Sequence, residues 1–387
     1  MVKIRAYRRP DGKIGVRNYV LLLPVSLCAS ETARFVKERV TGTVYIPNQG
    51  GCAQVPKDLA IVLETLSGLA ANPNVYGTVF LANGCETAQI DLVMERALKK
   101  SNKPHARVVI QEVGGTVKAV EEATRAAMRL VAEASAIERE EVDFSDIILA
   151  TECGGSDPTS GLASNPVIGS LSDRVVAEGA SVILSETTEL IGAEHIVGAR
   201  CATPEIRTQL LKTIADYEKH IQGVGENLRM GNPTPGNLVG GITTLEEKSL
   251  GCIHKGGHTT INEVLSYGAM VTKKGLVVMD TPGQDVASIA GMVAGGAQII
   301  VFSTGRGTPT GFGIAPVIKL TANKDTFRMM NDNMDFDASP VIEGKATIKE
   351  MGDSLFDLMI DTINGNRTKA EILGFNDMSI ARLCNFV

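Results

Sequence analysis

Acidic and imidazole side chains gather directly after one predicted buried strand. The apolar, β-branched residues 182–184 predict this strand. Four candidate ligands or bases follow it within the stretch 181–195: Glu186, Glu189, Glu194 and His195. If the segment turns helical, Glu186 and Glu189 share a face, and a break at Gly192 is needed to bring the other two beside them. Oxygen and nitrogen donors placed in this way suit a divalent metal or a general base. The alternative is a solvated helix start with glutamates at its positive end.

Four cysteines also follow predicted strands by a few residues. They are Cys28, Cys52, Cys85 and Cys153, and the last two have a glutamate as neighbour. The placement is compatible with metal ligands, with Cys85 and Cys153 as the candidates, or with a wall of a substrate site. The commoner reason for such cysteines is that a small residue fills a tight strand end. The seven cysteines are irregularly spaced and form no Cys-x-x-Cys pair, so neither a disulfide framework nor a zinc ribbon is expected.

A glycine-rich loop, Thr304-Gly305-Arg306-Gly307, follows the predicted strand 299–302. Its backbone N–H groups, hydroxyl and guanidinium suit a carboxylate, a sulfonate or a phosphate. It matches neither a Walker sequence nor a dinucleotide fingerprint, so we expect anion binding without a nucleotide. The alternative is a tight turn in which Arg306 makes a structural salt bridge. Lys248, in a predicted short helix over 243–251, either contacts an anionic substrate or is solvated.

Strand-length apolar runs alternate with helical patterns along the chain. Predicted strands are 19–24, 44–46, 79–82, 108–110, 147–150, 182–184, 276–279 and 299–302. Predicted helices include 59–69, 90–99, 117–132, 204–222, 355–363 and 368–373. This alternation predicts an α/β fold of parallel sheets with crossover helices, whose ligands bind in the loops at the carboxyl ends of strands. The prolines of 227–237 predict an extended segment that covers a site.

Length and charge restrict the class of protein. A chain of 387 residues is too long for one core, and a polar, helix-rich stretch at 134–143 predicts domains at 1–140 and 141–387 with the site between them. A net charge of -6, no Trp and only 4% aromatic residues argue against nucleic-acid binding. The chain has no apolar run of the roughly 20 residues that cross a bilayer, and the first residues have no export signal, so a cytoplasmic protein is expected.

Many short motifs together resemble one family, in the same order over essentially the whole chain. They are Arg9-Pro10-Asp11-Gly12, Gly15-Val16-Arg17-Asn18, Gly51-Cys52, Gly84-Cys85-Glu86, Glu152-Cys153-Gly154-Gly155-Ser156-Asp157, Ser185-Glu186, Glu194-His195, Pro235-Gly236-Asn237, Glu247-Lys248-Ser249, Met279-Asp280-Thr281-Pro282-Gly283, Met292-Val293-Ala294-Gly295-Gly296 and Thr304-Gly305-Arg306-Gly307. In this arrangement the chain resembles the altronate and galactarate dehydratase family.

The resemblance implies a β-eliminating lyase that uses Fe(II) or another divalent metal, such as Mn(II), and acts on a 2-hydroxy acid. The family includes sugar-acid dehydratases and the large subunit of sulfolactate sulfo-lyase, which expels sulfite instead of water. A separate small β-rich subunit is the implied partner, and an oligomer is expected. The implied catalytic residues are Glu186, Glu194, His195 and Lys248, and the implied metal ligands are Glu186, Glu189, His195, Cys85 and Cys153. The implied substrate contacts are Arg306, Thr304, Gly305, Gly307, Asn237 and Asp280.

Two departures bear on the substrate. The loop continues as Thr308-Pro309-Thr310-Gly311-Phe312, where sugar-acid dehydratases tend to have Ser, an aromatic-Gly pair and a basic residue, and the chain ends in Cys384-Asn385-Phe386-Val387 without Trp. These differences favour a shorter anion such as sulfolactate over a hexonate. The other interpretations are a sugar-acid dehydratase, a non-catalytic anion-binding subunit and a redox protein with a cysteine-bound cluster.

Overall fold

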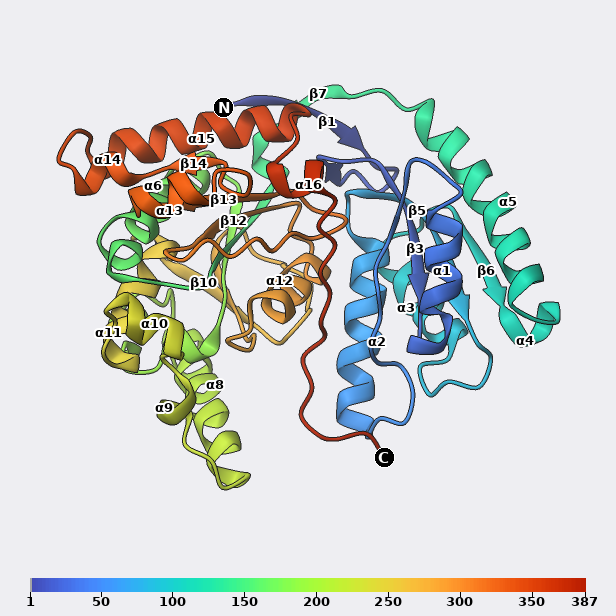
Figure 1. The fold of residues 1–387 in the computed structure, drawn as a ribbon, viewed down its shortest axis with the longest axis horizontal. Coiled ribbons are helices and arrows are strands. Elements are labelled where there is room, and N and C mark those ends of the chain that lie inside the picture. The colour runs from blue at the N-terminus through green and yellow to red at the C-terminus, as the bar shows by residue number, and fades with distance from the viewer. Residues whose placement is uncertain (1) are drawn as a thin grey trace.

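The computed structural model describes residues 2–387, and its N-terminal half is built on a four-stranded parallel sheet in the order β4-β3-β5-β6 (Figure 1). Its strands are β3 (Tyr19–Pro24), β4 (Thr43–Tyr45), β5 (Val75–Ala82) and β6 (His105–Val109). Its helices are α1 (Ser30–Lys37), α2 (Pro56–Ala71), α3 (Ile90–Lys100), α4 (Ile110–Val113) and α5 (Thr116–Ser135). Side chains alternate along β3, so that Val20 packs in a core with α1 and α5 while Leu21 packs in a core with α2 and α3.

A seven-stranded sheet in the order β10-β11-β9-β8-β12-β13-β14 forms the other half, and all its strand pairs are parallel. The strands are β8 (Ile148–Cys153), β9 (Ser181–Leu184), β10 (Ile261–Leu265), β11 (Gly275–Met279), β12 (Ile299–Ser303), β13 (Val317–Thr321) and β14 (Phe336–Asp337). Helices α6 (Asn165–Ala177) and α15 (Ile348–Asn364) cover one face, and α12 (Asp285–Ala294) with α2 covers the other. The predicted α/β fold with parallel sheets is therefore confirmed.

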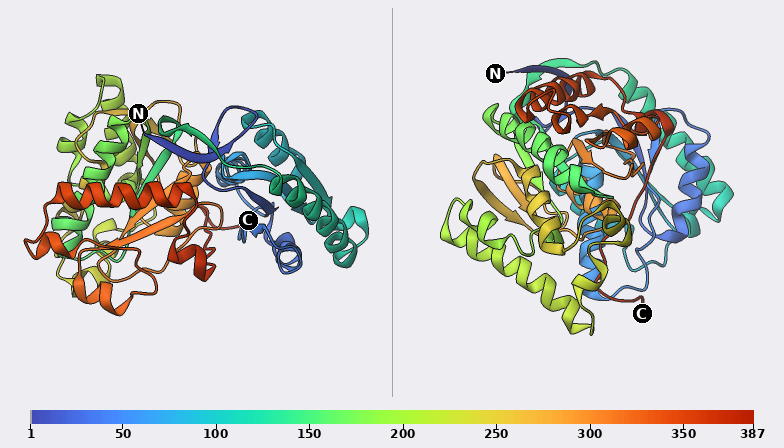
Figure 2. Two further views of the ribbon diagram at one scale, coloured as in Figure 1. Left: turned by 90° about the horizontal axis from the view of Figure 1, so that it is seen from above. Right: turned by 60° about the vertical axis from the view of Figure 1, so that its left-hand side comes forward.

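The two halves share one apolar core, because α2 packs against α12 between the sheets (Figures 1 and 2). The contact is close at Gly68, where a Cβ atom would lie 2.3 Å from the Ala294 carbonyl oxygen. One turn further, the Asn72 amide donates to the carbonyl oxygens of Val293 and Ala297, both at 2.8 Å. The seven-stranded sheet is thus fixed against the N-terminal half by backbone contacts as well as by apolar burial.

A third sheet departs from the prediction of parallel sheets alone. Strands β1 (Lys3–Arg8), β2 (Ile14–Gly15) and β7 (Glu140–Asp143) pair antiparallel in the order β2-β1-β7. The helical interpretation of 134–143 was wrong, because α5 ends at Ser135 and the following segment is a strand. The segment forms a strand because it pairs with β1: Val142 lies opposite Ile4, and both side chains are buried. The domain boundary near residue 140 stays a prediction.

The remaining helices lie around the edge of the large sheet. They are α7 (Glu194–Ala199), α8 (Pro204–Gly223), α9 (Leu228–Gly231), α10 (Pro235–Gly240), α11 (Leu245–Cys252), α13 (Lys324–Met329), α14 (Ser339–Ile342) and α16 (Lys369–Leu373). The extended path predicted for 227–237 was wrong in part. Pro235 instead opens α10, because its fixed φ suits a first helical position and Thr234 caps the helix by accepting from the Asn237 N–H.

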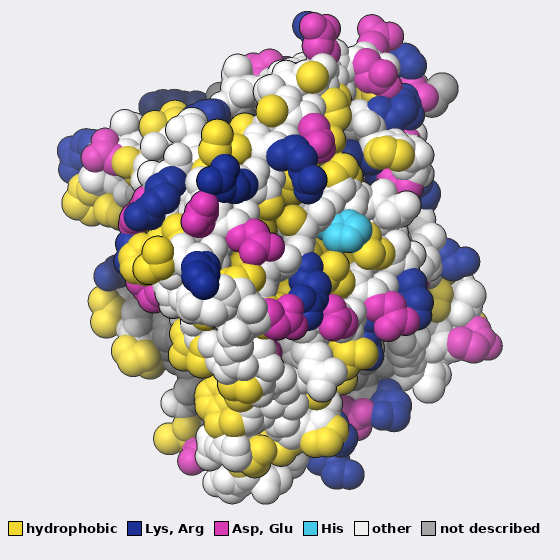
Figure 3. All heavy atoms as spheres, turned by 90° about the vertical axis from the view of Figure 1, so that its right-hand side faces the viewer, with side chains coloured by type: hydrophobic (Ala, Val, Ile, Leu, Met, Phe, Trp, Pro, Cys, Tyr) yellow, Lys and Arg dark blue, Asp and Glu magenta, His cyan; other side chains and the backbone are white. Residues whose placement is uncertain are grey.

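One face of the molecule shows how its charged side chains are distributed. On the face that carries α5, basic and acidic side chains are interspersed (Figure 3), in keeping with the argument against nucleic-acid binding. Within residues 2–387, none of the helices combines the length and apolarity that a bilayer span requires.

Candidate active site

Chemically active side chains meet at the carboxyl end of the central strand β8. Its last residues, Glu152 and Cys153, are paired with the end of β12, and Glu186 follows the neighbouring strand β9. Parallel strands end at the same edge of a sheet, so their following loops are brought together. Both glutamates and the cysteine are at most 1% exposed. Charged groups in such a place require partners inside the protein.

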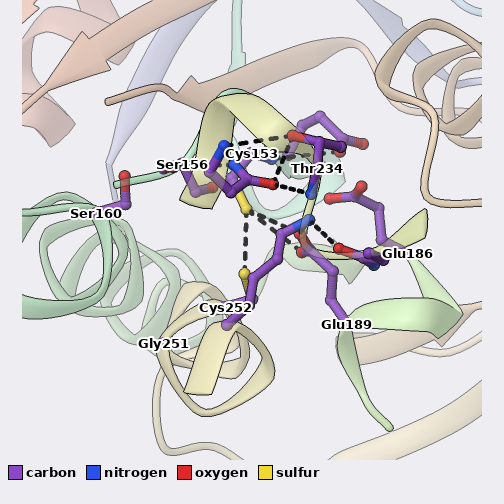
Figure 4. Close-up of polar contacts among 12 residues, drawn as sticks. Cys153, Ser156, Ser160, Glu186, Glu189, Thr234, Gly251 and Cys252 are labelled. Atoms are coloured by element: carbon purple, nitrogen blue, oxygen red, sulfur yellow. Dashed lines mark hydrogen bonds and ion pairs between the residues drawn. The ribbon is translucent and has the colours of Figure 1, made fainter. Parts of the chain in front are cut away.

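The partner is Lys255, on the short helix η5 (Ile253–Gly256). Its fully buried ammonium lies 2.8 Å from Glu189 Oε2, 3.2 Å from Glu186 Oε2 and 2.9 Å from Cys153 Sγ. Figure 4 shows Cys153, Glu186, Glu189 and Cys252 converging on this point. We call Cys153, Glu186, Glu189 and Lys255 the lysine cluster. One buried cation thus holds two carboxylates and a sulfur atom in fixed positions.

The charges of the cluster stabilise one another against burial. Although burial opposes it, the neighbouring Cys153 sulfur and Glu189 carboxylate raise the pKa of Lys255 well above its usual value. Burial likewise opposes the ionisation of Glu189, but Lys255 and Lys248 lower its pKa. Lys248 Nζ lies 3.3 Å from the other oxygen of Glu189, and this carboxylate in turn raises the pKa of Lys248 against the effect of burial. Both lysines are therefore cations at neutral pH.

A second sulfur atom adjoins the cluster. Cys252 Sγ lies 3.4 Å from Cys153 Sγ and is also buried. The hydrogen bond to Cys153, and then burial, raise the pKa of Cys252 well above its usual value, so it stays a neutral thiol. Cys153, Glu189 and Cys252 have the spacing of metal ligands. The Lys255 ammonium, however, already supplies a positive charge among them.

A second group of possible ligands consists of Glu152, Glu186 and Asp285, with one oxygen atom of each within 4.8 Å of the others. Glu152 and Glu186 hydrogen-bond to each other, so they share a proton. Burial, and then the Glu152 and Glu189 charges, raise the pKa of Glu186 well above its usual value. Burial and the charge of Glu152 raise the pKa of Asp285 to about 7. Each of these carboxyls is thus poised to bind a cation or to accept a proton.

The backbone at Glu186 is held in an uncommon conformation. Its φ of 63° is left-handed, which costs a non-glycine residue about 1–3 kcal/mol. The Glu186 N–H donates to Thr281 Oγ1 at 2.7 Å, and the Thr187 N–H donates to the Thr281 carbonyl at 3.0 Å. The loop after β11 therefore holds the carboxylate in place, and such strain is typical of functional sites.

Two glycines allow loops to approach the cluster. A Cβ atom on Gly154 would lie 1.9 Å from Asp285 Oδ2, and one on Gly155 would lie 3.2 Å from the Arg306 side chain. The loop 304–307 is a tight turn in which Thr304 Oγ1 accepts N–H groups from Arg306 and Gly307, at 3.3 and 2.9 Å. Arg306 is exposed and makes no salt bridge to any residue among 2–387, so the predicted salt-bridge alternative is not observed. Its guanidinium is free to bind an anion.

Several predicted site residues make no polar contact with the cluster among the described residues. His195 and Cys85 are exposed, on α7 and in the loop after β5, and neither has a recorded polar contact with the cluster among the described residues. Glu194 accepts the Gly192 N–H at 2.9 Å, so the glycine turn ties it to its own loop. The physical reason is that α7 begins only at Glu194, after the chain has turned away from the strand end.

Asn237 and Asp280 lie next to the site as supports. The Asn237 amide donates to the Ser156 carbonyl at 2.9 Å, which fixes the loop after β8. Asp280 accepts the Thr187 hydroxyl at 2.6 Å, directly beside Glu186. Both contacts position neighbouring loops of the protein. The roles of Asn237 and Asp280 as substrate contacts stay predictions.

Four residues of the site were not among the predicted ones: Glu152, Cys252, Lys255 and Asp285. Glu152 lies at the end of β8, and Asp285 opens α12 after the loop that follows β11. Both positions follow predicted strands, so their place in the sequence was a usable signal. Lys255 lies between a histidine and two glycines, in a segment that follows no predicted strand. Nothing in the local sequence distinguishes it from a solvated lysine. Only the tertiary fold brings it 2.8 Å from Glu189.

Comparisons with known proteins cover both halves of the chain. The family model described as D-galactarate dehydratase/Altronate hydrolase, second domain, matches residues 6–135, and the one described as D-galactarate/Altronate dehydratase, C-terminal, matches 144–385. The chain is 35% identical to the (2R)-sulfolactate sulfo-lyase subunit beta of Chromohalobacter salexigens, over 97% of this chain and 96% of that protein. It is 32% identical to the altronate dehydratase of Bacillus subtilis (97% and 77%) and 31% identical to the galactarate dehydratase of Escherichia coli (93% and 72%).

Proposed function

The chain belongs to the D-galactarate/altronate dehydratase family, and we propose that it is the catalytic subunit of a β-eliminating lyase whose substrate is (2R)-sulfolactate. As its relatives are named sulfo-lyase and dehydratases, the chain is an enzyme of the lyase class. The choice of sulfolactate is supported by one observation: the chain is 35% identical to the sulfo-lyase subunit, against 30–32% to the altronate and galactarate dehydratases. Sugar-acid dehydration is the second candidate, because those dehydratases are 30–32% identical to this chain.

The residues present fit a divalent metal. Glu152 and Glu186 are buried carboxyls that share a proton, and a cation in place of that proton would allow both to ionise. Their oxygen atoms are suitable ligands for Fe(II) or Mn(II). When bound, such an ion would supply a Lewis acid for the oxygen atoms of a 2-hydroxy acid. Glu189 and Cys153, which the sequence suggested as ligands, lie 2.8 and 2.9 Å from the Lys255 ammonium. Glu186 also contacts this ammonium, at 3.2 Å, but it belongs with Glu152 to a group of possible ligands that offers only oxygen atoms, so we assign the metal to Glu152 and Glu186.

Elimination requires a base for the weakly acidic proton on the carbon beside the carboxylate. Asp285 is assigned this role because its pKa of about 7 matches a base that works at neutral pH. The proton moves to the Asp285 carboxylate, the C–H electron pair forms the new C=C bond, and the bond from the next carbon to sulfur breaks. Sulfite leaves with that electron pair, and the enol tautomerises to pyruvate. Arg306 and Lys248 are the assigned contacts for the anionic groups.

A second chain completes the proposed enzyme. The relative that matches from end to end is named a beta subunit, which implies at least one further subunit in that protein. We assign this chain the same arrangement, with a separate small β-rich partner in an oligomer. Metal analysis of the anaerobically purified chain distinguishes the lyase from a non-catalytic anion-binding subunit, since stoichiometric iron or manganese is expected only for the former.

The function is tested by incubating the metal-loaded enzyme and its small subunit with sulfolactate and with a panel of aldonates and aldarates. Sulfite and a 2-keto acid are assayed separately. Equal amounts of sulfite and pyruvate from sulfolactate alone would support the proposal. A 2-keto acid produced only from a hexonate or an aldarate would instead identify a sugar-acid dehydratase.

Replacement of Arg306 by alanine is expected to weaken substrate binding more than it slows chemistry. The guanidinium is exposed and unpaired within the described chain, so its removal leaves no buried charge behind. Loss of a charge-assisted hydrogen bond of about 1.5–3 kcal/mol predicts a KM raised roughly 10- to 100-fold. Steady-state kinetics check this, with Arg207→Ala on α8 as a control. An unchanged KM would remove Arg306 from the substrate site.

Replacement of Gly154 by alanine is expected to displace the proposed base. The added Cβ would lie 1.9 Å from Asp285 Oδ2, so the carboxylate has to move. A shift of about 1 Å at a reacting group costs roughly 100-fold in rate, so kcat is expected to fall to that extent. Gly223→Ala, at a glycine with no atom within 4 Å of the added Cβ, is the matched control. A Gly154→Ala variant with normal kcat would contradict the role of Asp285.

A further inference from the structure

A hollow of about 330 Å³ opens beside the lysine cluster, between the loop after β8, the short helix η3 (Ser160–Ser164) and α11. Two of its wall residues belong to the chemistry already described: Cys252 adjoins Cys153, and Lys248 pairs with Glu189. The Ser156 side chain also lines it and lies close to Cys153 in Figure 4. The hollow therefore adjoins the lysine cluster through Cys252 and Lys248.

Most polar side chains of this wall already have partners. Asp157 accepts the Thr159 hydroxyl at 2.6 Å and the Asn323 amide at 2.9 Å. Asn165 donates to the Gly251 carbonyl at 3.1 Å. These groups are committed to the protein's own structure and have little left to offer a ligand.

Much of the remaining wall is apolar. Pro158, Leu162, Ile242 and Leu250 line the hollow. These side chains offer no hydrogen-bond partner to a substrate hydroxyl. A polyhydroxylated chain is therefore a poor occupant of this hollow.

The remaining donors of the wall are few and suit an anion: the Ser156 hydroxyl, Lys248 and the exposed His254 imidazole, which makes no hydrogen bond within residues 2–387. Ser156 is 2% exposed, and its buried hydroxyl has no hydrogen-bond partner within residues 2–387, which is unusual for a buried polar group. Lys248 Nζ is bonded to Asn232 Oδ1 at 3.1 Å and to Glu189 Oε1 at 3.3 Å, and its third N–H is uncommitted. One ammonium and one hydroxyl donor match the oxygen atoms of a single sulfonate or carboxylate.

We infer that this hollow binds the terminal anionic group of a short hydroxy acid, with the Ser156 hydroxyl and the Lys248 ammonium as its donors. The inference rests on the proposed function, and it deepens that proposal by assigning the substrate class: a small acid with a second anionic group, in preference to a polyhydroxylated sugar acid. Ser156 and Lys248 then determine specificity at the end of the substrate away from the metal.

Ligand binding tests the inference separately from turnover. The probes are 3-sulfopropionate, succinate, propionate and gluconate, titrated calorimetrically into the metal-loaded enzyme with its small subunit. We expect 3-sulfopropionate or succinate to bind at least about tenfold more tightly than propionate and gluconate, because one charge-assisted hydrogen bond contributes that much. The tighter of the two identifies the group as sulfonate or carboxylate.

Two variants locate the effect. Ser156→Ala is expected to reduce the preference over propionate about tenfold, and Lys248→Met to abolish it. Ser164→Ala is the matched control, because Ser164 Oγ is equally buried and unpartnered but does not line the hollow. Thermal melting of each variant shows that it is folded.

The outcomes separate the two proposals. Full selectivity in folded Ser156→Ala, or gluconate binding as tight as 3-sulfopropionate, would overturn the inference even if the enzyme eliminates sulfite. Absence of turnover on every 2-hydroxy acid, together with binding that depends on Ser156, would overturn the proposed function and leave the anion site intact.

Discussion

Replacement of Lys255 by methionine is expected to abolish turnover and to lower the free energy of unfolding by about 3–5 kcal/mol. The reason is that the side chain is fully buried and its ammonium contacts Glu186, Glu189 and Cys153. Removing the cation leaves buried carboxylates without compensation, and the proton that they then take up changes the geometry of the site. Activity assays and chemical denaturation measure the two effects.

Lys103 provides the matched control for this substitution. It is also a buried lysine, but its ammonium donates to backbone carbonyl oxygens, among them that of Ala71 at 2.9 Å, and burial lowers its pKa well below the usual value. Lys103→Met is expected to reduce stability with turnover preserved. If Lys255→Met does not fold, Lys255→Arg, which keeps the positive charge, is measured in its place. Near-normal turnover in folded Lys255→Met would remove the lysine cluster from the active site.

The sequence was informative where a local pattern decides the structure. The apolar run 182–184 lies in strand β9. Cys153 at the end of β8, and Glu186 and Thr304 in the loops after β9 and β12, lie at one edge of the sheet. Apolar, β-branched runs buried on both faces have few other conformations available. The position of a strand-end residue follows from the parallel arrangement alone, and for this reason Glu186 and Glu189 could be singled out.

The sequence was uninformative where the partner lies far along the chain. Lys255 and Glu186 are 69 positions apart, and Cys252 and Cys153 are 99 apart. No periodicity predicts that η5 packs behind β8. His195 is near Glu186 in sequence, but the Gly192 turn with a φ of 90° separates the two, and His195 is exposed at the start of α7 without a polar contact to the cluster among the described residues. Its catalytic role stays a prediction.

Glu186→Gln and Asp285→Asn are expected to separate metal binding from proton transfer. Glu186 shares a proton with Glu152 inside the protein, so an amide in its place removes a ligand charge, and the metal content is expected to fall to background. The Asp285→Asn variant is expected to retain the metal but to have a kcat at least about 100-fold lower, because a positioned base contributes that much or more. Elemental analysis and kinetics on the same preparations measure both quantities.

The pH dependence of the rate identifies the base. Asp285 has to be ionised to accept a proton, and its raised pKa means that kcat/KM increases with pH up to about 7 in this environment. A bound divalent cation favours the carboxylate, so metal loading is expected to move this increase to lower pH. The Asp285→Asn variant is expected to lose this increase of kcat/KM with pH. The Asp280→Asn variant, which changes the other partly buried aspartate of the segment 280–285, is expected to keep it. If Asp285→Asn lost metal together with Glu186→Gln, Asp285 would be a ligand and the base would have to be sought elsewhere in the cluster.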